Sequence, residues 1–339
     1  MVGRVRNRGY PPGHSRPHDT RTRGAAVTPL RHAADRARIV RTPDGAELRT
    51  HIRGPERAPV AAVLAHGWMQ ASDTWRLQAA RLASAGDDAV RTVRWDGRGH
   101  GGSTPGTRPI ANAALGDDLL RVLQDCAPEG PVVLAGHSMG GRAIMALAAA
   151  HPELFGERVA GVLLVATAAG RLETTGPGHT VGARMAGGAR LAAMRSLRRV
   201  PAAVDRLRAL LPPRSAAYRA AVRRVAFGAA ADPVRVRECA ELIHGTPTEV
   251  AAGFYETLAA EDLSGGLAAL REVPVRILAG GRDRLIGRGG TRALARALPH
   301  ARLRVLPGRG HMLPLEAPEA VGDELAEMCR AAARRPGGD

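Results

Sequence analysis

Residues 131–150 read PVVLAGHSMGGRAIMALAAA: an apolar run, a serine flanked by glycines, and an alanine-rich helical stretch, with no break between them. The pattern Gly136-x-Ser138-x-Gly140 is common by chance, but its place between a strand and a helix makes it specific. A serine on so sharp a turn needs small neighbours, and the two glycines remove the side chains that would collide with it. The segment therefore predicts a nucleophilic Ser138 exposed at a strand end, close to the positive end of a helix.

A serine hydroxyl is a weak nucleophile and needs a histidine base that a carboxylate orients. Among twelve histidines, His311 lies in a glycine-containing loop before the last helix, at the sheet edge expected for Ser138. Asp283 follows the apolar run 275–279 and meets the same condition, and Glu173 is the alternative carboxylate. The chain order Ser138, Asp283, His311 is typical of one serine hydrolase architecture.

An oxyanion needs hydrogen-bond donors that are already in place. The backbone N–H of Met139, directly after the serine, is the first donor we expect. The second is the N–H of Trp68 in His66-Gly67-Trp68, which follows the apolar run 60–65. Gly67 lets the backbone turn its amides inward, and His66 is interpreted as a residue that shapes this loop.

Apolar runs alternate with helical stretches along most of the chain, which predicts an α/β fold. Strands are expected at 60–65, 90–95, 132–135, 159–166, 275–279 and 303–306, and helices at 72–85, 111–126, 140–150, 290–298 and 317–333. Runs without polar alternation indicate strands buried on both faces, hence a doubly wound, mostly parallel sheet. Residues 38–41 and 47–52 flank Pro43-Asp44-Gly45 and predict a hairpin.

One interval, 170–262, interrupts this alternation, because it contains helical stretches and prolines but no convincing strand. It predicts a helical insertion at the carboxyl edge of the sheet. The expected core is then residues 38–169 together with 263–333. Residues 1–37, rich in Arg and Pro, and residues 334–339 are expected to be disordered tails.

The net charge of +17 over 339 residues suggests that the protein binds nucleic acid, but the distribution of the charge along the chain argues against this. The excess lies in residues 1–38, with nine Arg against two acids, and in residues 170–262, with fourteen Arg against nine acids. The chain has no lysine and only three each of Phe, Tyr and Trp, too few for base-stacking platforms. We therefore expect no nucleic-acid partner.

No run of 18 uncharged apolar residues is present, and residues 1–38 contain no apolar core of a secretory signal, so no membrane span is expected. The three cysteines are far apart, which argues against a disulfide framework or a thiolate metal site. These features predict a cytoplasmic protein without a bound metal. They leave its oligomeric state open.

Several motifs together resemble the α/β-hydrolase superfamily over about residues 38–330. They are His66-Gly67-Trp68, the run from Trp95 to Ser103 (WDGRGHGGS), the Ser138 turn, Asp283 and His311. The resemblance implies a Ser-His-Asp hydrolase with a helical cap, which matches residues 170–262. It also implies that His100 belongs to a structural loop and has no catalytic role. Serine at the turn argues against haloalkane dehalogenases and most epoxide hydrolases, which use aspartate.

The function that these residues favour is hydrolysis of a small-molecule, ester-like acyl substrate through an acyl-Ser138 intermediate, with no cofactor. A cofactor-free haloperoxidase or a carbon–carbon bond hydrolase would use the same triad. A non-catalytic ligand-binding protein of this fold is a further alternative. Such proteins often lack part of the triad, whereas Ser138, Asp283 and His311 are all present here.

Residues 188–225 hold ten Arg and one acid, Asp205. One interpretation is attraction of an anionic substrate or a membrane surface. We favour ordinary solvent-facing positions, with the Arg stems packed over Leu and Ala. Met185, Met194 and Leu197 are expected to pack inside this helical segment.

Overall fold

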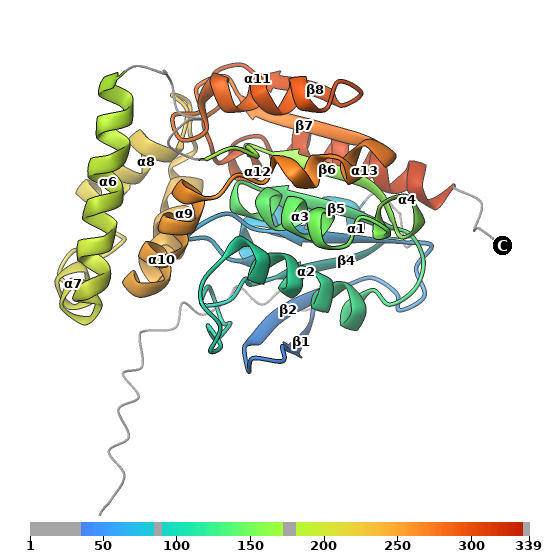
Figure 1. Ribbon diagram of the computed structural model, residues 1–339, viewed down its shortest axis with the longest axis horizontal. Helices are drawn as coiled ribbons and strands as arrows, with labels where there is room; N and C mark the ends of the chain where they lie inside the picture. Colours follow the sequence, from blue (N-terminus) through green and yellow to red (C-terminus); the bar gives the residue numbers. More distant parts are fainter. Residues whose placement is uncertain (1–34, 85–89, 172–180, 335–339) are drawn as a thin grey trace, which may run out of the picture.

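The computed structural model describes residues 35–84, 90–171 and 181–334 and contains an eight-stranded sheet in the order β1-β2-β4-β3-β5-β6-β7-β8 (Figure 1). The strands from β4 to β8 along this order are parallel, and β1 and β2 are antiparallel at one edge. Helices cover both faces. The predicted doubly wound, mostly parallel α/β fold is confirmed.

The bounds of the elements follow the sequence-based expectations closely. The strands are β1 (Arg36–Arg41), β2 (Glu47–Arg53), β3 (Val60–Ala65), β4 (Val90–Trp95), β5 (Val132–His137), β6 (Val159–Val165), β7 (Val275–Gly280) and β8 (Arg302–Leu306). The helices outside the insertion are η1 (Ser72–Trp75), α1 (Arg76–Ser84), α2 (Asn112–Cys126), α3 (Met139–Ala150), α4 (Leu154–Glu157), η2 (Ser264–Leu267), η3 (Ala269–Glu272), α11 (Gly287–Ala297), α12 (Leu313–Glu316) and α13 (Pro318–Ala333).

The central strands are buried on both faces, which is why their sequences are continuously apolar. Every residue of β3, β4, β5 and β6 is buried. One apolar core lies between the sheet and α2, α3 and α11, and a second lies between the opposite face and α1 and α13. The two cores hold the strand ends, and the loops that follow them, in fixed positions.

The amino-terminal boundary differs from the predicted one. β1 begins at Arg36, two residues before the expected start of the core. Asp35, which was assigned to the tail, already forms ion pairs with Arg53 and Arg94, and its side chain is buried. A buried carboxylate with two Arg partners fixes this end of the hairpin. Residues 1–34 lie outside the described chain.

The site is located where the strand order reverses. After β3 the chain passes through α1 to β4 on one side and then returns to β5 on the other side of β3. The loops after β3 and β5 therefore leave in opposite directions at their carboxyl ends. In open α/β sheets this switch point is the usual position of a ligand-binding crevice.

Within 181–262, all regular structure is helical. The helices are α6 (Val181–Arg199), α7 (Pro201–Ala209), α8 (Ala216–Ala226), α9 (Pro233–Gly245) and α10 (Thr248–Ala260). α6 packs on α10, and α6 and α7 form the outer edge of the molecule at the left of Figure 1. Glu173, the alternative carboxylate, lies outside the described residues. No helix in the described ranges is both long and apolar enough to cross a membrane.

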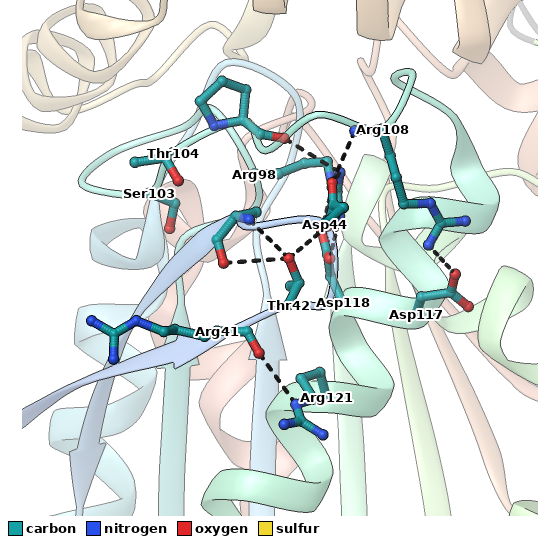
Figure 2. Close-up of polar contacts among 12 residues, drawn as sticks. Arg41, Thr42, Asp44, Arg98, Ser103, Thr104, Arg108, Asp117, Asp118 and Arg121 are labelled. Atoms are coloured by element: carbon teal, nitrogen blue, oxygen red, sulfur yellow. Dashed lines mark hydrogen bonds and ion pairs between the residues drawn. The ribbon is translucent and has the colours of Figure 1, made fainter.

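A buried ion network joins the β1–β2 turn to α2 (Figure 2). The guanidinium of Arg98 donates two hydrogen bonds of 2.7 Å to Asp118 and two, of 3.0 and 3.4 Å, to Asp44. Burial opposes ionisation of Asp44, but hydrogen bonds from Thr42, Arg98 and the Arg108 amide hold its pKa well below its usual value. For Asp118 burial outweighs its Arg98 partner, and the pKa is raised. The network fixes the loop that carries His100.

Replacing Arg98 with Ala should lower the free energy of unfolding by about 3–5 kcal/mol, because Asp118 would remain buried without its partner. Urea unfolding measures the change. Arg108→Ala is the matched control, since the Arg108–Asp117 pair is exposed and its loss should cost less than about 1 kcal/mol. Equal losses in the two variants would contradict a structural role for the buried network.

Candidate active site

Ser138 occupies a strained turn between β5 and α3. Its φ of 52° and ψ of −113° lie in a region that L-residues rarely adopt. A Cβ at Gly136 would lie 2.5 Å from the backbone of Gly140, and a Cβ at Gly140 would lie 2.1 Å from the Ala65 carbonyl oxygen. The turn is therefore possible only with glycine at both positions, as the sequence predicts. The Ser138 N–H bonds to the Val165 carbonyl at 2.9 Å, which anchors the turn to β6.

His311 and Asp283 lie together, as expected from the strand ends that precede them. The Nδ1 atom of His311 is 2.9 Å from Oδ2 of Asp283, and both side chains are buried. The other carboxylate oxygen accepts the N–H groups of Leu285 and Ile286 at 2.8 and 3.0 Å. Burial opposes ionisation of Asp283, but His311 and the two amides outweigh it and lower its pKa. The ionised carboxylate accepts the Nδ1 proton, so Nε2 of His311 remains available as a base.

Backbone contacts hold the loop of His311 from two sides. Its N–H donates to the carbonyl of Ala226, at the end of α8, at 2.8 Å. Its carbonyl accepts the Nε2 proton of His137 at 3.0 Å, and the two imidazole rings lie 4.9 Å apart. Burial, reinforced by the nearby His311, lowers the pKa of His137 to about 3, so its ring is neutral. Sequence reasoning missed this role of His137, although its place beside Ser138 was the available signal.

The loop after β3 brings Trp68 to the wall of the same cavity as Met139. Gly67 is required for a reason beyond turning the amides inward, because a Cβ there would lie 2.7 Å from Nδ1 of His137. His66 shapes the loop as predicted: its Nδ1 donates to the Gly67 carbonyl at 2.7 Å and its Nε2 accepts the Gly97 N–H at 2.8 Å.

His100 supports this loop from behind. Its Nδ1 donates to the Arg98 carbonyl at 3.0 Å, and its Nε2 accepts the Met69 N–H at 3.3 Å. Burial, with the neighbouring His66 ring, lowers the pKa of His100 to about 3. This neutral, enclosed ring fits the structural role that the resemblance implied.

A cavity of about 650 Å³ opens above Ser138 and is lined by His311, Trp68 and Met139 as well. Its remaining walls are mainly apolar side chains from the insertion and from the loops after β7 and β8: Met194, Tyr218, Ala221, Val222, Val225, Ala226, Ile243, Tyr255, Leu258, Leu285, Ile286 and Met312.

The expectation that Met185 and Met194 pack inside the helical segment is wrong. Met194 lines the cavity and Met185 is 71% exposed, because α6 packs along only one side.

Arg142, which sequence reasoning did not single out, also lines the cavity. Its buried guanidinium donates to the carbonyls of Ala168, Ala169 and Gly170, and to that of Glu261. Burial lowers its pKa to about 10. Because these carbonyls lie where the chain enters and leaves the insertion, Arg142 joins both ends of that segment to the helix that follows Ser138.

In the described part of the chain, no cluster of three or more His, Cys, Asp or Glu side chains is arranged to hold a metal ion. Cys126, Cys239 and Cys329 are buried.

Comparisons with known proteins agree with the fold. A model of the alpha/beta hydrolase family matches residues 62–324. A non-heme chloroperoxidase from Kitasatospora aureofaciens is 38% identical over 103 residues, which are 30% of this chain and 35% of that protein; the match thus spans only about a third of its length.

Solved structures extend the likeness to the whole fold. A thermophilic esterase from Thermogutta terrifontis has a TM-score of 0.68 at 24% identity, over 88% of this chain and 99% of its own. An enol-lactonase from Burkholderia xenovorans has a TM-score of 0.62 at 25% identity, over 84% of this chain and 97% of its own.

We expect Gly140→Ala to destabilise the protein by about 2–3 kcal/mol or more, because the added methyl group would overlap the Ala65 carbonyl. Urea unfolding measures the loss. The same substitution at Gly188, an exposed position of α6 with open space around it, should leave stability unchanged or raise it by about 1 kcal/mol. A harmless Gly140→Ala would mean that the turn is not as close to β3 as described.

Proposed function

The chain belongs to the alpha/beta hydrolase family, and on this basis we propose that it is a serine hydrolase that cleaves esters with a bulky apolar group. The observation that carries the proposal is the Asp283–His311 pair, 2.9 Å apart, of which His311 lines the same cavity as the strained Ser138. A nucleophile, a base and an orienting carboxylate are the minimum set for acyl transfer through serine.

In the proposed reaction, Ser138 Oγ attacks the carbonyl carbon of the ester while its proton moves to Nε2 of His311. The bond from carbon to the leaving oxygen then breaks, and His311 returns the proton to that oxygen. Water then loses a proton to His311 and attacks the acyl carbon. The bond from that carbon to Ser138 Oγ breaks, and His311 returns the proton to Oγ, which releases the acid and regenerates Ser138. Asp283 keeps the proton on Nδ1 throughout and stabilises the imidazolium that forms.

Two backbone amides are proposed to bind the oxyanion. Met139 is the first residue of α3, where an N–H has no partner within the helix and lies at its positive end. Trp68 offers the second N–H from the opposite wall, and its position is supported from the insertion by a 2.9 Å hydrogen bond from Nε1 to the Ala251 carbonyl. One such donor is typically worth about 10²–10³ in kcat.

The cavity supports a preference for apolar substrates. Aliphatic and aromatic side chains form most of its walls, and Met194, Val225 and Ile243 come from the helical insertion. We therefore propose that residues 170–262 act as a cap whose side chains select the group bound next to the ester. An alkyl or aryl chain would gain free energy by leaving water there.

The partial match to a chloroperoxidase favours one second candidate. If hydrogen peroxide replaced water as the acceptor of the acyl group, the same three residues would release a peracid, which oxidises halide. Adding peroxide and bromide to the esterase assay and measuring bromination of a dye tests this activity directly.

Ser138→Ala should lower kcat by about 10⁴-fold or more while the protein remains folded, since methyl replaces hydroxymethyl without crowding the turn. A series of p-nitrophenyl esters of increasing chain length measures kcat and KM, and thioester and amide analogues define the bond cleaved. A fluorophosphonate should label the wild type at Ser138 and leave the variant unlabelled. Retained turnover in Ser138→Ala would exclude the proposed nucleophile.

Asp283→Asn should lower kcat by about 10³–10⁴-fold with little change in KM, because the amide favours the wrong tautomer of His311 and cannot stabilise its cation. Asp323→Asn, on the exposed side of α13, is the matched control and should keep full activity. If Asp283→Asn were active and Glu173→Gln inactive, Glu173 would be the carboxylate.

The pH dependence of stability provides a second test of Asp283. Its pKa is lowered below 3.8 in the folded protein, so the ionised carboxylate favours the folded state above that pH. The difference in unfolding free energy between wild type and Asp283→Asn should be constant at neutral pH and shrink as the pH falls through the folded pKa. A difference in unfolding free energy that grows on acidification would contradict a lowered pKa of Asp283 in the folded protein.

A further inference from the structure

Large apolar side chains are exposed mainly on one part of the molecule. In the described chain ten such side chains are exposed, and six of them lie between residues 185 and 225: Met185, Val200, Leu207, Leu210, Leu211 and Val225. Leu207 and Leu210 are 69% and 79% exposed. The Arg stems therefore do not cover these leucines, in contrast to the expectation from the sequence.

The helix α7 has one attached side and one exposed side. On the attached side, the carboxylate of Asp205 accepts hydrogen bonds from Thr248, and Arg208 donates to the Thr246 carbonyl at 2.8 Å. On the other side, Arg206, Leu207 and Leu210 are exposed. Leu210 lies four residues after Arg206 and three after Leu207, so it shares a face with both. The helix α7 lies at the outer edge of the molecule in Figure 1. We name the set Val200, Arg206, Leu207, Leu210 and Leu211 the α7 patch.

The charge around the α7 patch is strongly positive. The one acid within 188–225 is Asp205. It forms an ion pair with Arg208 and accepts a hydrogen bond from Thr248. Some of the arginines pair with acids of neighbouring helices, as Arg198 does with Glu256 at 3.4 Å. Arg199 and Arg206, next to Val200 and Leu207, have no carboxylate within ion-pair distance in the described ranges. The patch thus combines exposed aliphatic groups with unneutralised guanidinium groups.

Charge decides what fits this surface. A second copy of the chain would bring Arg against Arg, and residues 1–38, with nine Arg against two acids, would be repelled as well. Nucleic acid would neutralise the arginines but leave the leucines in water. The surface of an anionic lipid bilayer can bind both the arginines and the leucines. Its phosphates pair with guanidinium groups, and its acyl boundary takes up aliphatic side chains.

We propose that the α7 patch docks the protein peripherally on anionic lipid bilayers. The docking does not depend on the proposed hydrolase activity, but it agrees with an apolar substrate. Val225 lines the cavity and is also 51% exposed, so the cavity reaches the surface on the same helical segment as the patch. A docked protein would take up esters that are dissolved in the lipid.

The test is co-sedimentation of the full chain with vesicles of phosphatidylcholine alone and with about one third phosphatidylglycerol. Wild type should bind the anionic vesicles at least about tenfold more tightly, and raising the salt from about 0.05 to 0.5 M should weaken binding. Leu207→Glu combined with Leu210→Glu should reduce binding by at least about tenfold, because the variant places charge where aliphatic groups enter the lipid. Arg199→Gln combined with Arg206→Gln should weaken binding to anionic vesicles about tenfold or more.

Val305→Glu is the matched control, since Val305 is exposed on β8, away from the α7 patch, and its replacement should leave vesicle binding unchanged. Far-UV circular dichroism and urea unfolding without vesicles should be the same for wild type and all variants, which shows that they are folded. Full binding by the Leu207/Leu210 variant, equal binding to both vesicle types, or no binding by wild type would each overturn the proposal. So would concentration-dependent dimerisation of wild type, abolished in the Leu207/Leu210 variant, without vesicle binding.

Discussion

The backbone between β5 and α3 passes so close to the end of β3 that residue 140 has no room for a Cβ. This close approach brings the start of α3 against the loop after β3, and Trp68 and Met139 line one cavity as a result. It also forces Ser138 into a left-handed conformation, which the hydrogen bond to β6 maintains. The strain is local, and the two apolar cores on either side of the sheet compensate for it.

Three buried histidines lie around this turn and connect its loops. His66, His100 and His137 each donate one ring N–H to a backbone carbonyl, and burial lowers the pKa of each below its ordinary value. A neutral ring with a fixed tautomer is a rigid connector between loops. His311 differs, because its Nδ1 faces the carboxylate of Asp283 and not a backbone carbonyl. Similar side chains thus serve as supports or as a candidate base according to the group opposite them.

The helical insertion is coupled to the site through a few polar contacts. Arg142 joins both of its ends to α3, Trp68 bonds to α10, and the backbone of His311 bonds to the end of α8. A movement of α8 or α10 would therefore reach the loops that carry His311 and Trp68. α6 and α8 contribute residues to the cavity wall, whereas α7 exposes apolar and cationic groups at the outer edge.

The sequence alone determined the strand and helix order, the strained turn at Ser138, and Asp283 and His311 as its companions. These depend on local patterns: apolar runs set the strands, glycines mark the turn, and parallel strands carry their loops to one edge. The connecting role of His137, the position of Arg142 and the exposure of Leu207 and Leu210 were decided by the tertiary structure. Each depends on which residue, distant in the chain, packs opposite it, and no local pattern encodes that partner.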